Sequence, residues 1–492
     1  MSGFHDALKA GVFVDEADFV VVGSGAGGGA AARALARGGA SVVVLEEGPL
    51  AETASLGVVA RESMSRLFRH GGKMAAFGRA TLPILQGRCV GGTTFVNSAI
   101  IWRLPDKIVA DWVKRFGLSA TVDAAALERV YRVIEDEMSV RAVEEGVTSG
   151  RQDLLLRDAA AQVGIAGRFM HRSEFGCRGS GRCLHGCPHE AKQSTAVNHL
   201  RRAVADGANV FANAEVRRVL IERGRAVGVQ GRGFQIKARR AVVVAASAIQ
   251  SPNLLHRSGV RHPHLGHHFM AHPGTTIMAL YPDRVGAWSG ASQGYEAIGL
   301  RDELGIKVES INVPPEIAAA RMPGAGKRLS SYLDRLDHLA VWALAIRADS
   351  EGRVRPSLMF GDRVDYQVSS NDLGRLRKGL KRVGEMHFVA GAKEIIPGVF
   401  GLPEVMTSPD QLHLFDDAPL DPRAYSMVAT HLFGGCRAGI DPATSVVNAH
   451  LRVHDVQSLY VMDASVFPTN TGVNPQHSIM ALSTVAAERL LT

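Results

Sequence analysis

The chain has 492 residues, enough for a large core in two or three domains, and its 46% hydrophobic and 21% charged residues are ordinary for a globular protein. The net charge of +8 comes from scattered basic residues without interleaved aromatics, so nucleic-acid binding is not expected. No run of about 18 apolar residues exists, which argues against a membrane-spanning helix. The N-terminal residues lack the basic and apolar segments of a signal peptide, so a cytoplasmic location is expected.

The first recognisable pattern lies at residues 18–49, where an apolar run, a glycine turn, an alanine-rich helix and a second apolar run follow one another. This order is typical of the opening of a parallel, doubly wound sheet. Gly23, Gly25 and Gly28 fit G-x-G-x-x-G, in which the glycines make the turn, admit a pyrophosphate and pack helix on strand. Glu46, which ends the second run, can accept ribose hydroxyls. The pattern predicts a bound dinucleotide, and the alternative is a glycine-rich helix packed tightly on a sheet.

Four further segments follow in chain order. Residues 123–137 carry apolar side chains at helical spacing after an aspartate that can cap the helix. Residues 209–246 are interpreted as a meander of short strands that returns to a buried strand. Residues 274–425 contain several prolines and few recognisable elements, and residues 474–491 are expected to form a helix.

The glycine fingerprint occurs once, which favours one tightly held FAD over a flavin with a second nicotinamide site. GRCVGGTTFVN at 87–97 resembles the second glycine stretch of the glucose–methanol–choline (GMC) flavin oxidoreductases. SAIQSPNLLHRSGV at 247–260 resembles the second signature of that family, with an arginine after it in place of the usual glycine. The stretches 431–439 and 458–482 resemble its C-terminal block. These motifs span nearly the whole chain in the order of the family.

The resemblance implies an α/β fold with two domains. One is a Rossmann-like FAD-binding domain, made of a parallel sheet and a β-meander, and the other is an interleaved α+β substrate-binding cap. The FAD-binding domain is expected at residues 15–100, 190–273 and 426–492. The cap is expected at residues 101–189 and 274–425, with the cysteine segment 177–187 at the junction.

The resemblance also implies which residues contact the flavin. Besides the first glycine turn and Glu46, the expected cofactor-binding residues are Gly91, Gly92, Thr93, Asn97, Val216, Asp463, Ala464 and Pro475. Val216 is expected to contact the adenine through its backbone. Asp463 is expected to meet the ribityl chain and the flavin ring.

Oxidation of an alcohol by a flavin requires a group that removes the hydroxyl proton, and a neutral histidine suits this task. Among the 19 histidines, His431 lies in an H-x-x-G-x-C pattern, and the resemblance implies that it is the base. Asn474 matches the position where relatives hold the substrate oxygen with His or Asn. Asn474 and Pro475 are also expected to begin the last helix, as its cap and first residue, so that the positive helix end faces the flavin.

Other histidines receive supporting or structural roles. His477, on the first turn of the last helix, is a candidate second base, but alignment with the family favours a supporting role. The cluster of His267, His268 and His272 is expected to be structural. A metal is the less favoured interpretation there, because no convergent partners can be named.

CRGSGRCLHGCPHEAKQST holds Cys177, Cys183 and Cys187, three of the five cysteines of the chain. The same C-x5-C-x3-C-P spacing is found in FAD-dependent glucose dehydrogenase catalytic subunits, and this resemblance implies an iron–sulfur cluster, 3Fe-4S rather than 4Fe-4S. The AKQST that follows is more similar to long-chain alcohol oxidases. Two alternatives stay open: structural or disulfide-forming cysteines, and zinc with His185 or His189 as fourth ligand.

The sequence therefore predicts an FAD enzyme that oxidises an alcohol to an aldehyde or ketone and passes electrons through the cluster to an external acceptor, a protein or small partner subunit. Because no cluster of polar groups is visible in the expected cap, a hydrophobic or aromatic alcohol is favoured over a sugar. The alternatives are a flavin oxidase that uses oxygen and a non-catalytic flavoprotein or redox sensor. Export to the periplasm with a signal-bearing partner is the alternative to a cytoplasmic location.

Overall fold

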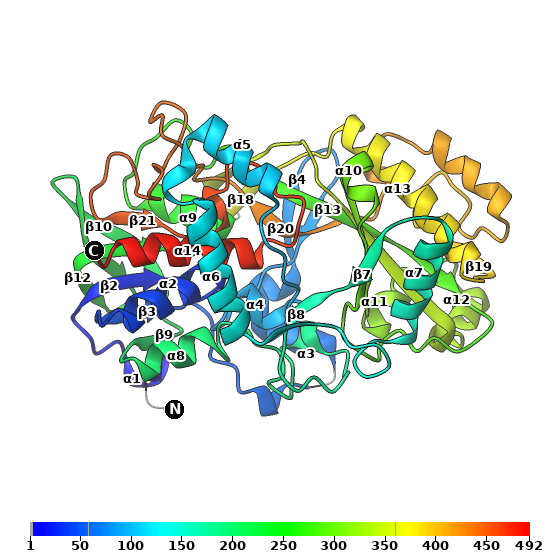
Figure 1. Cartoon of the computed structure of the whole chain (residues 1–492), viewed down its shortest axis with the longest axis horizontal. Coiled ribbons are helices and arrows are strands. Elements are labelled where there is room, and N and C mark those ends of the chain that lie inside the picture. The colour runs from blue at the N-terminus through cyan, green and yellow to red at the C-terminus, as the bar shows by residue number, and fades with distance from the viewer. Residues whose placement is uncertain (1–2, 58, 360) are drawn as a thin grey trace.

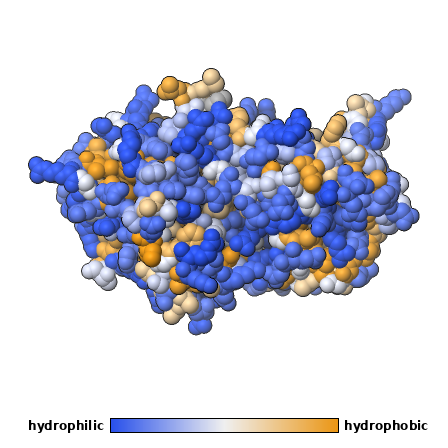
Figure 2. Space-filling view, turned by 90° about the horizontal axis from the view of Figure 1, so that it is seen from above, coloured by the Kyte–Doolittle hydropathy of each residue, from blue (hydrophilic) through white to orange (hydrophobic). Residues whose placement is uncertain are grey.

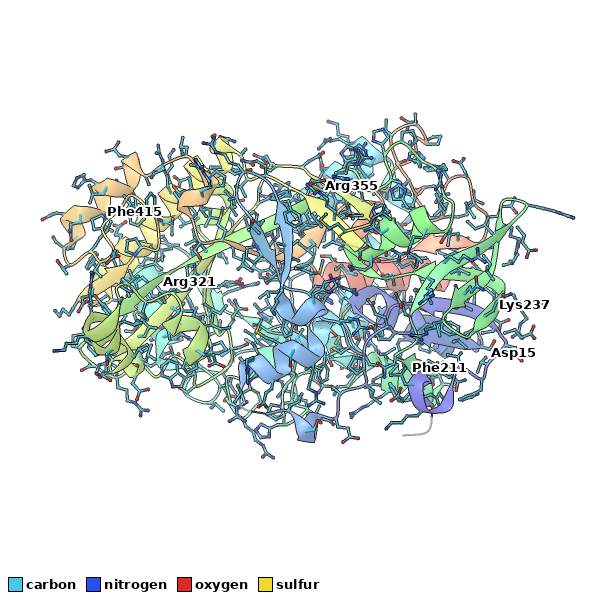
Figure 3. All side chains as sticks on the ribbon, turned by 180° about the vertical axis from the view of Figure 1, so that it is seen from behind. Asp15, Phe211, Lys237, Arg321, Arg355 and Phe415 are labelled. Carbon is cyan, nitrogen blue, oxygen red and sulfur yellow. The ribbon has the colours of Figure 1, made fainter. Side chains whose placement is uncertain are left out.

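The computed structural model describes residues 3–57, 59–359 and 361–492. Figure 1 shows an elongated molecule with two lobes, each built around its own sheet, and with both chain ends on the side of the first sheet. The two lobes have separate hydrophobic cores: Phe211 belongs to the first core and Phe415 to the second. Figure 3, seen from behind, shows Phe211 and Lys237 in one lobe and Arg321 and Phe415 in the other.

The first sheet has eight strands in the described residues, in the order β1-β9-β3-β2-β12-β11-β10, with β21 beside β12. They are β1 (Phe4–Asp6), β2 (Glu16–Val22), β3 (Val42–Leu45), β9 (Asn209–Ala212), β10 (Val216–Glu222), β11 (Arg225–Gly231), β12 (Gln235–Val244) and β21 (Leu459–Val461). β2 pairs in parallel with β3 and β12 through runs of valine. These strands are covered on both faces, which explains why they read as continuous apolar runs in the sequence.

Helices α2 (Ala26–Arg37), α6 (Ala124–Glu137), α8 (His199–Ala205) and α14 (Gln476–Arg489) pack in this lobe, with α2 between α8 and α14. The strand, glycine turn, helix and strand predicted at 18–49 are confirmed as β2, α2 and β3. The helix predicted at 123–137 is confirmed as α6. Its cap is Asp123, whose carboxylate accepts a hydrogen bond from the Ala126 amide at 2.7 Å.

Three local predictions were wrong. The segment 235–244 is one strand rather than two, because β12 pairs antiparallel with β11 in its first part and parallel with β2 and β21 further on. β9 lies between β1 and β3 rather than in the meander. The last helix begins at Gln476 with Pro475 as its cap residue, because the Asn474 side chain bonds to Lys307 and His431 instead of to the helix.

The second sheet has eleven strands in the residues that the structure describes, in the order β17-β18-β4-β5-β20-β13-β16-β15-β14-β7, with β19 beside β13. They are β4 (Met74–Phe77), β5 (Leu82–Ile84), β7 (Gly167–Phe169), β13 (Met270–Leu280), β14 (Tyr295–Ala297), β15 (Ile306–Ser310), β16 (Leu339–Ile346), β17 (Arg353–Ser357), β18 (Gly361–Asp365), β19 (Glu394–Ile396) and β20 (Val428–Phe433). Residues 274–425, in which few elements could be predicted, supply most of this sheet. β13 is its central strand and pairs with β20 at one end and with β16 along the rest.

The remaining helices and strands lie around the two sheets. They are α1 (Ala7–Ala10), α3 (Ala60–Leu67), α4 (Thr93–Val96), α5 (Asp106–Phe116), α7 (Arg151–Gln162), α9 (Ser247–Arg257), α10 (Leu300–Leu304), α11 (Pro315–Ala319), α12 (Gly326–Leu333), α13 (Ser370–Val389) and the pair β6 (Val140–Ala142) and β8 (His171–Ser173). The long helix α13 packs against β13, β15 and β16. Short 3-10 helices include η4 (Cys183–His185) and η8 (Ala464–Val466).

The visible face in Figure 2 is mostly hydrophilic, with apolar side chains scattered in small groups. Across the described ranges, no helix is both long and apolar enough to cross a membrane.

Candidate active site

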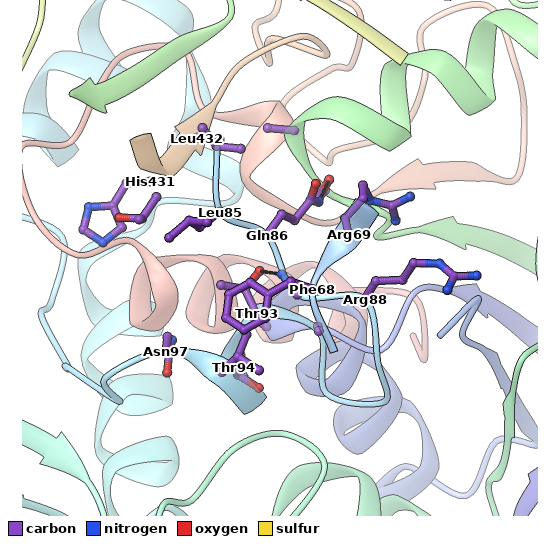
Figure 4. A pocket seen from close by; sticks show the side chains of 18 of the residues that line it. Phe68, Arg69, Leu85, Gln86, Arg88, Thr93, Thr94, Asn97, His431 and Leu432 are labelled. Carbon is purple, nitrogen blue, oxygen red and sulfur yellow. Dashed lines mark hydrogen bonds between the residues drawn. The ribbon is translucent and has the colours of Figure 1, made fainter. Parts of the chain in front are cut away.

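A cavity of about 1360 Å³ extends from the glycine turn of the first sheet to the middle of the second sheet. The predicted site residues that line it are Gly23, Gly25, Glu46, Gly92, Thr93, Asn97, Val216, His431, Asp463, Ala464, Asn474 and Pro475. Gly28, Gly91 and the three clustered cysteines are not among its lining residues. Figure 4 shows Arg69 and Arg88 on one side of this cavity and His431 on the other. The cavity therefore has a basic end and a histidine end.

The first glycine turn is built by close packing of backbone. Gly23 has φ +97°, and a Cβ on Gly28 would lie 1.9 Å from the Gly23 carbonyl oxygen, so neither position accepts a side chain. Gly25 differs, because the nearest atom to a Cβ there is the Gly92 Cα at 4.0 Å. The space beside Gly25 is thus open to the cavity, as it would be for a pyrophosphate held at the start of α2.

Glu46 holds this turn in place. Its Oε2 accepts hydrogen bonds from the Ser24 amide (3.1 Å) and hydroxyl (2.6 Å), and its Oε1 accepts one from the Gly48 amide (2.9 Å). Glu46 also lines the cavity, next to Glu47, which pairs with Arg69. A carboxylate has about four lone-pair sites, so Glu46 retains acceptor capacity for a ribose hydroxyl.

The second glycine stretch lies directly against the first. A Cβ on Gly92 would approach the Gly25 Cα to 2.9 Å. Thr195 joins the two turns, because its hydroxyl lies 2.9 Å from the Ser24 carbonyl oxygen and 3.0 Å from the Thr94 hydroxyl. Thr195 belongs to the AKQST segment after the cysteines, and its role was not predicted from the sequence.

Asp463 connects two segments that are far apart in the chain. Its carboxylate accepts hydrogen bonds from the Ser247 amide (2.9 Å), the Ser251 hydroxyl (2.5 Å) and the Ser465 amide (2.8 Å). Burial raises the pKa of this carboxyl, although these hydrogen bonds oppose the shift. Asp463 therefore fixes the start of α9 against η8, where Ala464 faces the cavity.

The histidine end of the cavity contains His431 on β20 and Asn474 just before α14. The Asn474 Nδ2 lies 3.3 Å from the His431 Nε2. Burial lowers the pKa of His431 well below its ordinary value, and nearby His272 and Lys307 lower it further. The imidazole is therefore neutral at physiological pH and able to accept a proton.

Two residues in direct contact with this pair were missed. His272 on β13 was expected to be structural, but its Nδ1 lies 3.0 Å from the His431 Nδ1. Lys307 on β15 bonds to the Asn474 Oδ1 and forms an ion pair with Glu309. The pairing of β13 with β20 and of β15 with β16 brings these residues together, and no local pattern in the sequence indicates either pairing.

The other histidines lie elsewhere. His268 bonds to Glu351 at 2.7 Å and stacks on His264, outside the cavity. His477 is fully buried and its Nε2 lies 3.0 Å from Glu135 of α6, so its ring does not reach the cavity.

The cysteine segment is arranged differently from a metal centre. Across residues 3–57, 59–359 and 361–492, no group of three or more His, Cys, Asp or Glu side chains is placed to hold a metal ion. The Cys183 sulfur instead accepts a hydrogen bond from Arg172 at 3.1 Å, and the Cys187 sulfur one from the Lys192 amide at 3.4 Å. The arrangement therefore does not support the predicted iron–sulfur cluster, nor zinc, at Cys177, Cys183 and Cys187.

Two buried cations hold this segment. Burial alone would raise the pKa of the Cys183 thiol, but the charges of Arg172 and Lys192 outweigh it and bring the pKa to about 7. Lys192 also donates to the carbonyl oxygens of Phe95, Asn97 and Cys183 at 2.6–2.8 Å. The next two residues of η4, Leu184 and His185, line the cavity. The segment therefore forms part of the cavity wall.

A βαβ unit with a glycine turn, opening onto a cavity with a neutral histidine at the far end, defines a dinucleotide-binding oxidoreductase. The comparisons with known proteins identify the family. Residues 64–274 and 348–483 match the two family models described as GMC oxidoreductase. The chain belongs to the GMC oxidoreductase family, whose members oxidise CH–OH groups with FAD.

Individual relatives agree with this assignment. The uncharacterized GMC-type oxidoreductase Rv0492c of Mycobacterium tuberculosis is 37% identical, over 97% of this chain and 76% of the relative. The long-chain-alcohol oxidase FAO4A of Arabidopsis thaliana is 25% identical, over 95% of this chain and 67% of the relative. Among solved structures, pyridoxine 4-oxidase from Mesorbium loti is similar in fold, with a TM-score of 0.73, 18% identity and coverage of 96% of this chain and 98% of that chain. Family membership supports an enzyme over the non-catalytic flavoprotein considered from the sequence.

Proposed function

We propose that the protein oxidises a hydrophobic or aromatic alcohol to an aldehyde or ketone, with His431 as the base and Asn474 as the group that holds the alcohol oxygen. The observation that carries the proposal is their placement: the His431 Nε2 and the Asn474 Nδ2 lie 3.3 Å apart on the wall of the cavity that also contains the glycine turn. This spacing suits a hydroxyl that donates to the imidazole while its oxygen accepts from the amide.

The residues proposed to hold FAD are those predicted from the sequence. Gly23, Gly25, Glu46, Gly92, Thr93 and Asp463 line the cavity, Gly28 and Gly91 lie behind this wall in the two glycine turns, and the open space beside Gly25 fits a pyrophosphate. FAD, when bound, accepts the hydride of the alcohol and passes two electrons to the final acceptor. The protein supplies the base, orients the alcohol and excludes water around the reacting carbon.

The walls of the histidine end favour an apolar substrate. Apolar residues of the second lobe that line the cavity include Ile311, Val313, Ile317, Leu344 and Leu432. Two polar side chains of the cavity wall are already engaged, because Glu309 pairs with Lys307 and accepts from Gln293 at 2.9 Å. Each unpaired buried polar group costs about 1–3 kcal/mol, so an alcohol with few hydroxyls is favoured over a sugar. The name of the long-chain-alcohol oxidase relative is consistent with an apolar alcohol.

The proposed electron acceptor is molecular oxygen, which is reduced to hydrogen peroxide. Two similar proteins are named as oxidases. A dehydrogenase was predicted from the sequence because the cysteine segment could hold a cluster. Among the described residues no group there is placed to hold a metal ion, so the segment does not support that electron route. An electron route through an iron–sulfur cluster forms no part of the proposal.

A panel of alcohols mixed anaerobically with the purified flavoprotein tests this function. Aliphatic and aromatic alcohols should bleach the flavin, glucose should not, and admission of air should release one peroxide per aldehyde. Flavin that stays oxidised with every alcohol would refute the proposed activity. Stoichiometric iron with a paramagnetic cluster signal would refute oxygen as the proposed acceptor and would support the iron–sulfur cluster predicted from the sequence.

A further inference from the structure

A chain of hydrogen bonds passes through His431 and ends on fixed groups at both sides. It runs from Lys307 to Asn474, to His431, to His272 and to Asn470. Each end can be assigned from groups whose donors and acceptors are known, so the proton positions on both imidazoles follow.

The Asn470 amide is oriented by backbone. Its Nδ2 donates to the carbonyl oxygens of Ala271 (3.0 Å) and Ala348 (3.3 Å), and its Oδ1 accepts from the Gly472 amide (3.0 Å). The Oδ1, an acceptor only, also bonds to the His272 Nε2. The His272 Nε2 must therefore carry a hydrogen.

The hydrogen on His272 determines the one on His431. Burial lowers the pKa of His272 to about 3, so this imidazole is neutral and its Nδ1 has a lone pair. The His431 Nδ1, at 3.0 Å, must then be the donor of this bond. Since His431 is also neutral, its Nε2 is left without a hydrogen.

The Lys307 end of the hydrogen-bond chain independently gives the same result, a His431 Nε2 without a hydrogen. Lys307 has donors only, so the Asn474 atom that it contacts must be the carbonyl oxygen. The amide is thereby oriented with its Nδ2 toward the His431 Nε2, at 3.3 Å. Lys307 is itself held by Glu309, which accepts from Gln293 at 2.9 Å.

We propose that Lys307, His272 and Asn470 are positioning residues that hold His431 with its hydrogen on Nδ1 and its Nε2 lone pair facing the cavity. This inference rests on the proposed function of His431 and Asn474. The alcohol hydroxyl donates to the Nε2 while the alcohol oxygen accepts from the Asn474 Nδ2. The His431 Nε2 takes the hydroxyl proton, and FAD, when bound, would supply the acceptor for the hydride of the carbon that bears the hydroxyl, so that a carbonyl forms.

The same chain can keep its hydrogen bonds in the protonated state of the base. When the Nε2 gains a proton, the imidazolium donates its Nδ1 hydrogen to the His272 Nδ1, which already accepts it. No proton moves onto His272, and Asn470 keeps its hydrogen bonds. Without Lys307, the Asn474 amide is free to turn its oxygen toward His431, which removes the donor that holds the alcohol oxygen and opposes the tautomer with a lone pair on Nε2 that the His272 end favours.

Rapid anaerobic flavin reduction by an alcohol, compared among Lys307→Met, Lys307→Arg and Lys107→Met, tests the role of Lys307. Lys107 is an exposed lysine on α5, paired with Asp302, and serves as the matched control. We expect the limiting rate of Lys307→Met to fall about 100-fold at an almost unchanged alcohol dissociation constant and flavin content. Lys307→Arg should recover part of this loss, because arginine also only donates, and Lys107→Met should match the wild type. Equal loss in Lys307→Met and Lys307→Arg, or a loss confined to alcohol binding, would overturn the role of Lys307.

Neutron diffraction from deuterated crystals of the flavin-loaded protein tests the assignment without any turnover. Deuterium is expected on the Nδ1 of His431 and on the Nε2 of His272. Deuterium on the Nε2 of His431 would overturn the proposal. If no alcohol reduces the wild-type flavin, the proposed function fails, whereas the deuterium positions still decide the hydrogen-bond chain.

Discussion

His431 lies among protein groups that oppose its protonation. These are the buried surroundings of the ring and two neighbouring side chains, His272 and Lys307. Burial comes first, and the nearby His272 and Lys307 lower the pKa of His431 further. Glu309, a carboxylate of the cavity wall, is already paired with Lys307. A base with a lowered pKa is unprotonated throughout the physiological pH range, but it binds a proton more weakly than an ordinary histidine does.

This environment predicts the pH dependence of the reaction. Protonated His431 cannot act as a base, and its pKa lies well below the ordinary value of 6.5. The value of kcat/KM should therefore be constant above pH 6.5 and fall only at lower pH, as the neutral imidazole is lost. Steady-state measurement across this range with a neutral alcohol provides the check. A decline that begins above pH 6.5 on acidification would mean that the base is an unperturbed histidine or another group.

At the scale of elements, local patterns were predictable and long-range pairings were not. The glycine turn and α2 could be predicted because their packing depends on residues within one βαβ unit, and α6 because its apolar side chains repeat at helical spacing. The second sheet could not, since pairings that join its parts, such as β13 with β20 and β18 with β4, span more than a hundred residues. His272 and Lys307 were missed for the same reason: each is unremarkable in the sequence until the strands align.

Two glycines of the same turn should respond differently to alanine. In Gly28→Ala the new Cβ meets the Gly23 carbonyl oxygen at 1.9 Å, and the apoprotein should lose about 1–3 kcal/mol of its free energy of unfolding. In Gly25→Ala the Cβ enters open space and the backbone angles suit alanine, so the apoprotein should keep its stability. FAD binding should weaken by about 1.4 kcal/mol or more, a factor of ten. Urea unfolding and FAD titration of both variants separate these effects, and unchanged FAD affinity in Gly25→Ala would contradict the placement of the pyrophosphate.

A buried ion pair lies beside the cysteine segment and is expected to stabilise it. Arg172 and Glu174 are almost fully buried and lie 3.0 Å apart, so Arg172→Met would leave a buried carboxylate without its cation. We expect a loss of about 3–5 kcal/mol in the free energy of unfolding. Arg284→Met, which breaks the exposed pair with Asp337, should cost less than about 1 kcal/mol. Chemical denaturation of the two variants measures the difference, and equal losses would show that the Arg172 pair is not what holds the segment.

At the scale of the whole molecule, the proposed catalytic pair, His431 and Asn474, depends on how the two sheets are placed. His431 belongs to β20 of the second sheet, whereas Asn474 precedes α14, which packs on the first-sheet helix α2. The 3.3 Å between them is thus set by packing between the lobes. The division into FAD-binding and cap domains at the predicted boundaries stays a prediction, and β13 crosses the boundary proposed between residues 273 and 274. The family motifs predicted the type of reaction from the sequence. The neighbours of His431, which are His272 and Lys307, could be found only in the folded structure.

The most direct test of alcohol oxidation by the His431 and Asn474 pair is single-turnover flavin reduction in His431→Gln. Glutamine keeps a polar side chain of similar reach but cannot accept a proton as a base. The variant should retain its FAD and its alcohol affinity, and the rate of flavin reduction by a hydrophobic alcohol should fall about 1,000-fold below that of the wild type. Flavin reduction at the wild-type rate in His431→Gln would contradict the assignment of His431 as the base.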